Sequence, residues 1–126
     1  MGARYTMKIV TDFAAAHALR GYPGDCARLH GHNWKVEVEV EATRLDEIGM
    51  GLDFKAIKHA TRRCIEGLDH RNLNEIPPFD EINPTAENIA AHLYRNLARE
   101  LNSDAVSVSR VTLWETERAC VSYSER

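Results

Sequence analysis

The sequence predicts an α+β domain in which a four-stranded antiparallel sheet carries two helices on one face. Three observations lead to this fold class: strict two-residue alternation over residues 32–43, two later stretches with helical spacing, and two short alternating stretches at the end. The predicted order is therefore β-β-α-α-β-β, and such grouping of strands and helices is typical of the α+β class. A length of 126 residues fits a single domain over residues 1–126.

The two N-terminal strands carry the clearest pattern. In HNWKVEVEVEAT (residues 32–43), apolar residues at even positions alternate with polar ones, which predicts a strand with one buried and one wet face. Residues 5–19 mix β-branched and aromatic residues with looser alternation and predict the preceding strand. Because the glycines and the proline of residues 21–24 indicate a loop, the two strands should pair antiparallel.

Two helices and two closing strands follow. Asp53 is a suitable N-cap for a helix over Phe54–Gly67, and Thr85 for a second helix whose apolar stripe ends at Leu101. The stretches VSVSRVTLWETE and CVSY predict the closing strands, with a register slip near Ser109–Arg110. Such a sheet keeps two open edges, and we therefore expect the chain to self-assemble.

The composition excludes several classes of protein. The net charge is -3 and no basic block is present, so a nucleic-acid partner is not expected. No apolar run approaches the ~20 residues of a membrane span, and no signal-peptide pattern opens the chain, so a cytoplasmic location is expected. Three cysteines without a CxxC spacing (Cys26, Cys64 and Cys120) argue against a disulfide framework and against a cysteine-rich zinc ribbon.

Three histidines form a candidate metal site. His30 and His32 are two apart at the start of a strand, so their side chains point to the same face. His17 lies near the end of the preceding strand, and hairpin pairing brings it opposite this pair. Three imidazoles suit zinc, with one position left for water or substrate, although an HxH pair can also consist of ordinary hydrogen-bonded residues.

The thiol in CARLHGHNW leaves two interpretations open. Cys26 could be a fourth ligand, which would make a closed, structural His3Cys site. Alternatively, it stands off the metal as a reactive thiol in a polar, partly exposed loop. The spacing alone does not separate a zinc-stapled module from an enzyme.

A second group of polar residues lies further along. Asp69 and His70 are adjacent at the end of the first helix, where they could either cap the helix or act together. Glu115 shares a strand face with Leu113, so it is either a strand-end glutamate in water or an anchor that accepts two parallel hydrogen bonds. His59 and His92 are expected to be surface histidines.

Taken together, these motifs resemble the 6-pyruvoyltetrahydropterin synthase family, and most of all its bacterial branch, 6-carboxytetrahydropterin synthase of queuosine (7-deazapurine) biosynthesis. The matching motifs run from residue 13 to 117 and are FAAAH, CARLHGHN, GLDF, LDHRNLN, NPTAEN and ETE. Each motif is weak alone, whereas their joint occurrence in this order is specific.

The resemblance implies a tunnelling fold, with trimers whose strands form a barrel and which stack into a hexamer. It also implies zinc as the cofactor and 7,8-dihydroneopterin triphosphate as the substrate. The implied roles are metal binding by His17, His30 and His32, general-base catalysis by Cys26, a proton relay through Asp69 and His70, and pterin binding by Glu115.

Within the family, the carboxy branch has three residues between the thiol and HGH, as CARLHGH does. It releases acetaldehyde and triphosphate and leaves a 6-carboxyl group, whereas the pyruvoyl branch only eliminates triphosphate. A third branch, partly an aldolase, replaces the cysteine with glutamate. Arg20, Arg28 and Arg71 flank the motifs and are candidates for triphosphate binding.

Overall fold

The computed structural model describes residues 2–125; of the predicted domain over residues 1–126, Met1 and Arg126 lie outside the described residues. The strands are β1 (Tyr5–His17), β2 (His30–Ala42), β3 (Arg71–Asn72), β4 (Val106–Thr116) and β5 (Ala119–Tyr123). The helices are α1 (Phe54–Glu66) and α2 (Ala86–Leu101), and two short 3-10 turns cover Asp25–Ala27 and Leu73–Glu75.

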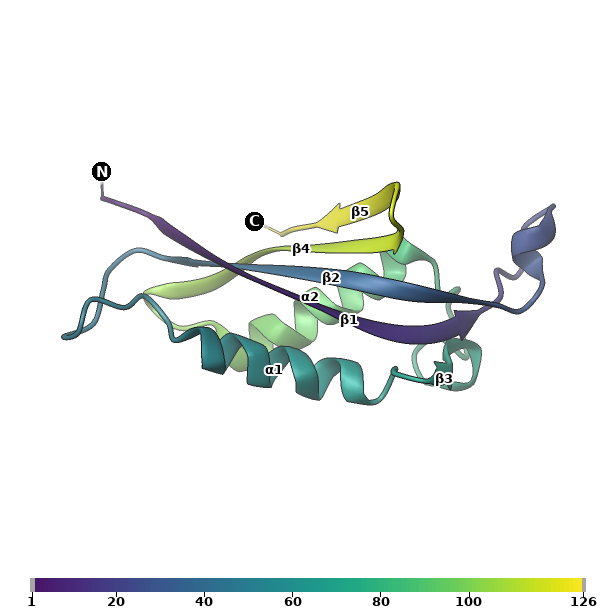
Figure 1. Cartoon of the computed structure of the whole chain (residues 1–126), viewed down its shortest axis with the longest axis horizontal. Helices are drawn as coiled ribbons and strands as arrows, with labels where there is room; N and C mark the ends of the chain where they lie inside the picture. The colour runs from purple at the N-terminus through teal and green to yellow at the C-terminus, as the bar shows by residue number, and fades with distance from the viewer. Residues whose placement is uncertain (1, 126) are drawn as a thin grey trace.

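One sheet with the strand order β3-β1-β2-β4-β5 forms the frame of the molecule (Figure 1). All neighbours pair antiparallel except β1 and β3, which are parallel. The predicted α+β class and the order of the long elements are confirmed. The predicted number of four strands is wrong, because the two-residue β3 joins the edge of β1 and is too short to leave a periodic pattern.

The β1–β2 hairpin pairs without interruption from Tyr5 opposite Ala42 to His17 opposite His30. The first strand was predicted over residues 5–19, but it ends at His17, two residues earlier. The second strand begins at His30, so the whole HGH motif belongs to it. This register places the histidines of the two strands side by side at one end of the hairpin.

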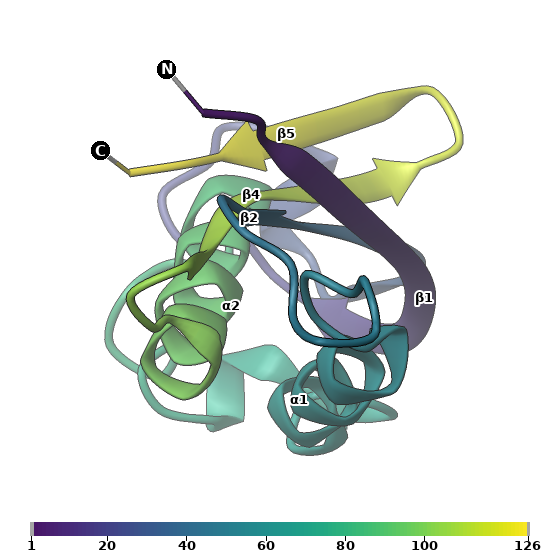
Figure 2. The ribbon, with the colours of Figure 1, turned by 90° about the vertical axis from the view of Figure 1, so that its left-hand side faces the viewer.

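Both helices cover the same face of the sheet (Figure 2). The even-numbered residues of β2 point to this face, and Trp34, Val36, Val38 and Val40 have no exposed surface. Removing such apolar area from water is the main stabilising contribution in a domain of this size, at about 25 cal/mol per Å². No helix within residues 2–125 combines the length and the apolar character needed to cross a membrane.

The predicted helix caps are present. The Asp53 carboxylate accepts a hydrogen bond from the Lys55 N–H at 2.8 Å, and the Thr85 hydroxyl accepts one from the Asn88 N–H at 3.1 Å. Each bond satisfies an N–H group that has no partner inside its helix. A hydrogen bond from the His17 ring to the carbonyl of Pro84 holds the N-terminus of α2 next to the histidine end of the hairpin.

The register slip predicted near Ser109–Arg110 is a β-bulge. Glu39 pairs with Arg110 while Val40 pairs with Val108, which leaves Ser109 as the extra residue. The Ser109 hydroxyl donates to the carbonyl of Glu39 at 3.1 Å. A second irregularity lies between Trp114 and Thr116, where Glu115 has no partner in β5.

Candidate metal and active site

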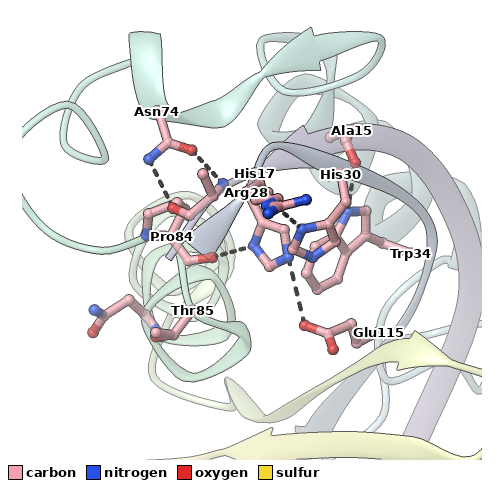
Figure 3. A network of polar contacts seen from close by, with 11 residues as sticks. Ala15, His17, Arg28, His30, Trp34, Asn74, Pro84, Thr85 and Glu115 are labelled. Atoms are coloured by element: carbon pink, nitrogen blue, oxygen red, sulfur yellow. Dashed lines mark hydrogen bonds and ion pairs between the residues drawn. The ribbon is translucent and has the colours of Figure 1, made fainter. Parts of the chain in front are cut away.

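His17, His30 and His32 come together at the end of the hairpin, as the sequence predicts. One ring nitrogen from each lies within 4.8 Å of those of the other two. Figure 3 shows His17 between the chain segment of Pro84 on one side and His30 on the other. The pairing of His17 with His30, and the two-residue period of β2, account for this placement.

Backbone carbonyls orient two of the three rings. The Nδ1–H of His17 donates to the carbonyl of Pro84 at 2.7 Å, and the Nδ1–H of His30 donates to the carbonyl of Arg28 at 2.7 Å. With a proton on Nδ1, each ring carries its lone pair on Nε2. Such carbonyl partners are typical of metal-binding histidines, since they fix both the tautomer and the direction of the ring.

The free nitrogens fit a cation. His17 Nε2 and His32 Nε2 are buried and lack a hydrogen-bond partner within the described part of the chain, which is costly unless something else binds them. Burial holds the pKa of His17 and of His32 below 6.5, so both rings favour the neutral form that binds metals. These three residues could therefore hold a metal ion.

Trp34 forms the apolar floor of the cluster. Its ring centroid lies 5.0 Å from that of His17 and 5.2 Å from that of His32. Its indole N–H donates to the carbonyl of Ala15 at 3.2 Å. A buried ring that is anchored in this way limits the directions in which the imidazoles can tilt.

Glu115 stands beside the cluster. Its carboxylate lies 3.7 Å from His17 Nε2, and its side chain is 33% exposed. It borders a hollow of about 230 Å³ whose lining also includes Leu19, Thr85 and Cys120. The β-bulge at this position lets a residue near the strand end turn toward the site. A half-exposed carboxylate here is available to a ligand in the hollow.

Cys26 lies in the 3-10 turn between β1 and β2 and is half-buried. Its carbonyl accepts the N–H of Leu19 at 2.9 Å. The group whose ligand atoms lie within 4.8 Å of one another comprises the three histidines, and the Cys26 thiol is not part of it. The partly exposed loop expected from the sequence is confirmed.

Asp69 and His70 lie at the sheet edge, just after α1. The Asp69 N–H donates to the carbonyl of Ile65 in the last turn of α1 at 2.9 Å, while its side chain is bonded elsewhere. The Asp69 carboxylate accepts the N–H of Ala14 at 2.9 Å and lies 3.0 Å from His70 Nδ1. The Ala14 N–H is the main reason why the pKa of Asp69 lies below its ordinary value. The left-handed backbone of His70 (φ 59°) lets these adjacent side chains meet.

His70 lies at the surface, and Asp69 of the same chain is its ionic partner. Its side chain is 82% exposed, and within residues 2–125 no hydrogen bond or ion pair joins it to His17, His30, His32 or Cys26. It borders an open hollow of about 510 Å³ that also touches His32 and Arg71. The structure thus brings Asp69 and His70 together, but it does not join this pair to Cys26.

The arginine candidates differ from one another. The guanidinium of Arg20 is exposed and donates to the carbonyls of Phe79 at 2.7 Å and Ile82 at 3.3 Å, so part of its hydrogen-bonding capacity holds the loop. Arg28 and Arg71 are exposed. His92 is half-buried rather than a surface histidine, because its ring packs on Phe79 at 5.2 Å.

Sequence reasoning missed the loop that surrounds His17. It supplies the Pro84 carbonyl and the side-chain amides of Asn74 and Asn83, which bind the backbone after His17. Both asparagines lie inside motifs that the sequence singles out, LDHRNLN and NPTAEN. A backbone carbonyl leaves no signal in a sequence, so the contact to Pro84 could not be predicted.

Fold and site together define an α+β protein with three histidines arranged to hold a metal ion. Residues 6–126 match the profile of the family described as 6-pyruvoyl tetrahydropterin synthase. The chain therefore belongs to the 6-pyruvoyl tetrahydropterin synthase family, and it is a lyase of the tetrahydropterin-synthase type.

Curated relatives and a solved structure agree with this assignment. The 6-carboxy-5,6,7,8-tetrahydropterin synthase of Rickettsia typhi is 32% identical, over 87% of this chain and 93% of the relative. The dihydroneopterin monophosphate aldolase of Pyrococcus furiosus is 39% identical over 82% of each chain. The structure of 6-pyruvoyl tetrahydropterin synthase from Caenorhabditis elegans superposes with a TM-score of 0.88 at 26% identity, covering 99% of this chain and 98% of that one.

Proposed function

We propose that the protein converts 7,8-dihydroneopterin triphosphate into 6-carboxy-5,6,7,8-tetrahydropterin, with release of acetaldehyde and triphosphate, in queuosine biosynthesis. The observation that carries the proposal is the three-histidine cluster, with His17 buried and the Cys26 thiol outside the group of clustered ring nitrogens. The spacing of CARLHGH and the names of relatives such as that of Rickettsia typhi support the carboxy branch. Atom balance requires that one water molecule is consumed.

His17, His30 and His32 would hold zinc through nitrogen. Three neutral imidazoles are a common zinc ligand set in catalytic sites, and two of these rings have the fixed orientation that such a set needs. Bound there, zinc would act as a Lewis acid that makes the C–H and O–H groups of the substrate side chain more acidic.

The other side chains divide the remaining tasks. Cys26 would remove a proton as a thiolate, and Asp69 with His70 would return or relay one. Glu115 would accept two N–H groups from the guanidine-like edge of the pterin, which suits a half-exposed carboxylate beside a hollow of about 230 Å³. The same residue therefore orients the substrate relative to the histidines.

The proposal includes the assembly of the chain into a hexamer of two stacked trimers, acting in the cytoplasm. Two features support the assembly. The edge of β1 is covered by β3 only at Ala15 and Ala16, and β5 has an open outer edge. In addition, the His70 side chain is 82% exposed, and within residues 2–125 no hydrogen bond joins it to Cys26, so we propose that it serves the site of a neighbouring copy.

The decisive experiment is an assay of the products. The purified protein is incubated with 7,8-dihydroneopterin triphosphate, and acetaldehyde and triphosphate are quantified together. We expect equal amounts of both. Triphosphate without acetaldehyde would show the pyruvoyl reaction instead, and the release of neither would contradict a synthase activity.

A second candidate function is aldol cleavage, which the 39% identity to the aldolase of Pyrococcus furiosus favours. Cleavage of this type leaves a 6-hydroxymethyl group on the pterin, so chromatography of the pterin products separates it from the carboxy reaction. The presence of Cys26 favours the carboxy reaction. A predominant 6-hydroxymethyl product, from either the triphosphate or the monophosphate, would establish the aldolase.

The alternative of a closed site, in which Cys26 is the fourth zinc ligand, is tested on the protein without substrate. X-ray absorption at the zinc edge reports the neighbours of the ion, and a thiolate ligand gives a Zn–S shell near ~2.3 Å. We expect only nitrogen and oxygen neighbours. A sulfur shell in the protein without substrate would establish the structural site and would remove Cys26 as a free base.

A further inference from the structure

The backbone immediately after His17 is held by two asparagine side chains. Asn74 donates from Nδ2 to the Ala18 carbonyl at 2.9 Å and accepts the Ala18 N–H on Oδ1 at 2.8 Å. Asn83 makes the same pair of bonds to Arg20, both at 2.8 Å. Figure 3 shows the Asn74 amide lying against this segment. Each amide replaces a residue of a neighbouring strand at a point where β1 has already ended.

Leu19, which lies between Ala18 and Arg20, forms its backbone hydrogen bond on the opposite side of the chain. In an extended chain, alternate residues direct their N–H groups to opposite sides. Ala18 and Arg20 face the asparagines, and the Leu19 N–H donates to the Cys26 carbonyl at 2.9 Å. The same three residues therefore connect His17 to the turn that carries Cys26.

The loop that supplies Asn83 also orients His17 directly. Pro84, the next residue, provides the carbonyl for the His17 Nδ1–H. The Asn88 amide donates to the Asn83 carbonyl at 2.8 Å, so the N-terminal turn of α2 fixes this loop in turn. A displacement of the loop would move both the ring of His17 and its hydrogen-bond partner.

We propose that Asn74 and Asn83 are positioning residues that set the geometry between the metal ligand His17 and the Cys26 turn. The inference rests on the proposed role of the three histidines as metal ligands. An amide is required because each contact needs one donor and one acceptor from the same side chain. A carboxylate of the same size accepts but does not donate, and it would face the Ala18 or Arg20 carbonyl with a second oxygen.

The test uses Asn74→Asp and Asn83→Asp in the full chain. Asn96→Asp is the matched control, because Asn96 lies in α2, is part-buried and bonds to His92. Each metal-free protein is titrated with Co²⁺, whose visible spectrum reports the symmetry of its ligands, and far-UV circular dichroism verifies folding. Loss of an outer partner of a ligand typically weakens metal binding about tenfold or more.

We expect Asn74→Asp and Asn83→Asp to bind Co²⁺ about tenfold more weakly than the wild type and to change its visible spectrum. Asn96→Asp should match the wild type in both respects. If Asn74→Asp and Asn83→Asp both keep the wild-type affinity and spectrum, the proposal is overturned. If the wild-type protein itself fails to bind Co²⁺, the proposed metal site is wrong, and this result is distinct from a failure of the role proposed for the two asparagines.

A second measurement needs no variant. Hydrogen exchange in the wild-type protein should show the Ala18 and Arg20 amides protected, because both N–H groups are donated to asparagine oxygens. Exchange of both amides at the rate of an open loop would also overturn the proposal. This arm remains decisive if an Asp variant does not fold.

Discussion

At the scale of single residues, the position of the Cys26 thiol outside the histidine cluster matters most. A thiol that binds the metal stabilises the site, whereas a thiol beside it is available for proton transfer. The three histidines already form a set that two backbone carbonyls orient. The Cys26 thiol makes none of the contacts that orient these rings.

Replacement of the thiol should therefore separate binding from chemistry. We expect Cys26→Ala to retain one zinc per chain and to lose acetaldehyde production, because only the proposed base is removed. Zinc content is measured by mass spectrometry. Cys64→Ala, in α1 and not among the residues that line the hollow beside Glu115, is the control and should keep both properties. Loss of zinc from Cys26→Ala would instead indicate a ligand.

The thiol of Cys64 should be unreactive. Burial, together with the nearby Glu100, raises the pKa of the Cys64 thiol to about 11. At pH 8 only about 10⁻³ of such a thiol is ionised, and the thiolate is the reactive form. We expect iodoacetamide to modify Cys120 in the folded protein and to spare Cys64, as read by peptide mass spectrometry. Equal labelling of the two would contradict this burial.

His92 should make the protein sensitive to acid. Burial, with a smaller effect of Arg99, holds its pKa below 6.5 in the folded state. As the pH falls below about 6.5, the unfolded state binds this proton more readily, so the free energy of unfolding decreases. We expect His92→Gln to show a shallower loss of stability than the wild type.

Urea denaturation at pH 7.5 and pH 5.5 measures this difference. His59→Gln, on the exposed face of α1, is the matched control. Equal pH dependence of the wild type and His92→Gln would contradict the assignment. The comparison of variants removes the contribution of the site histidines, which is common to all three proteins.

At the scale of elements, the caps and bulges decide where helices begin and where strand residues turn. The Asp53 carboxylate satisfies the Lys55 N–H at the start of α1. The two irregularities of β4 have different effects. The extra residue Ser109 keeps the apolar residues on either side of it facing the core, whereas the irregularity at Glu115 lets that side chain turn toward the histidines.

The cap of α1 can be tested without touching the site. We expect Asp53→Ala to lower the free energy of unfolding by about 1 kcal/mol, since it leaves an N–H group of the first turn without its partner. Urea denaturation measures the change. Glu47→Ala, an exposed carboxylate in the loop before the cap, should have little effect. Equal losses in the two variants would indicate a general charge effect rather than capping.

At the scale of the whole molecule, the exposure of His70 and the absence, within residues 2–125, of a hydrogen bond from His70 to Cys26 lead us to predict that a complete site needs two copies of the chain. Two inactive variants, Cys26→Ala and His70→Ala, should then complement each other. In mixed assemblies with random arrangement of equal amounts, about a quarter of the sites combine both intact residues.

We expect acetaldehyde production to return to about a quarter of the wild-type rate after the two variants are unfolded and reassembled together. Each variant reassembled alone is the control. No recovery in assemblies shown by sedimentation to be mixed would mean that both residues act in the same chain. A monomer at all concentrations would contradict the proposed hexamer.

Much of the fold could be predicted from local patterns. The alternation of Trp34 to Ala42 predicted β2, the caps at Asp53 and Thr85 predicted the helix starts, and the slip near Ser109 was anticipated. These features depend on neighbours within a few residues. Prediction of the two-residue β3 failed because only its contact with β1 makes it a strand.

The sequence by itself determined which residues gather at the site, because a period of two and hairpin pairing suffice to place His17 opposite His30 and beside His32. The tertiary structure alone decided how those rings are held. The Pro84 carbonyl and the amides of Asn74 and Asn83 come from more than fifty residues away. Contacts between such distant segments arise only when helices and sheet pack together, and they leave no periodic trace in the sequence.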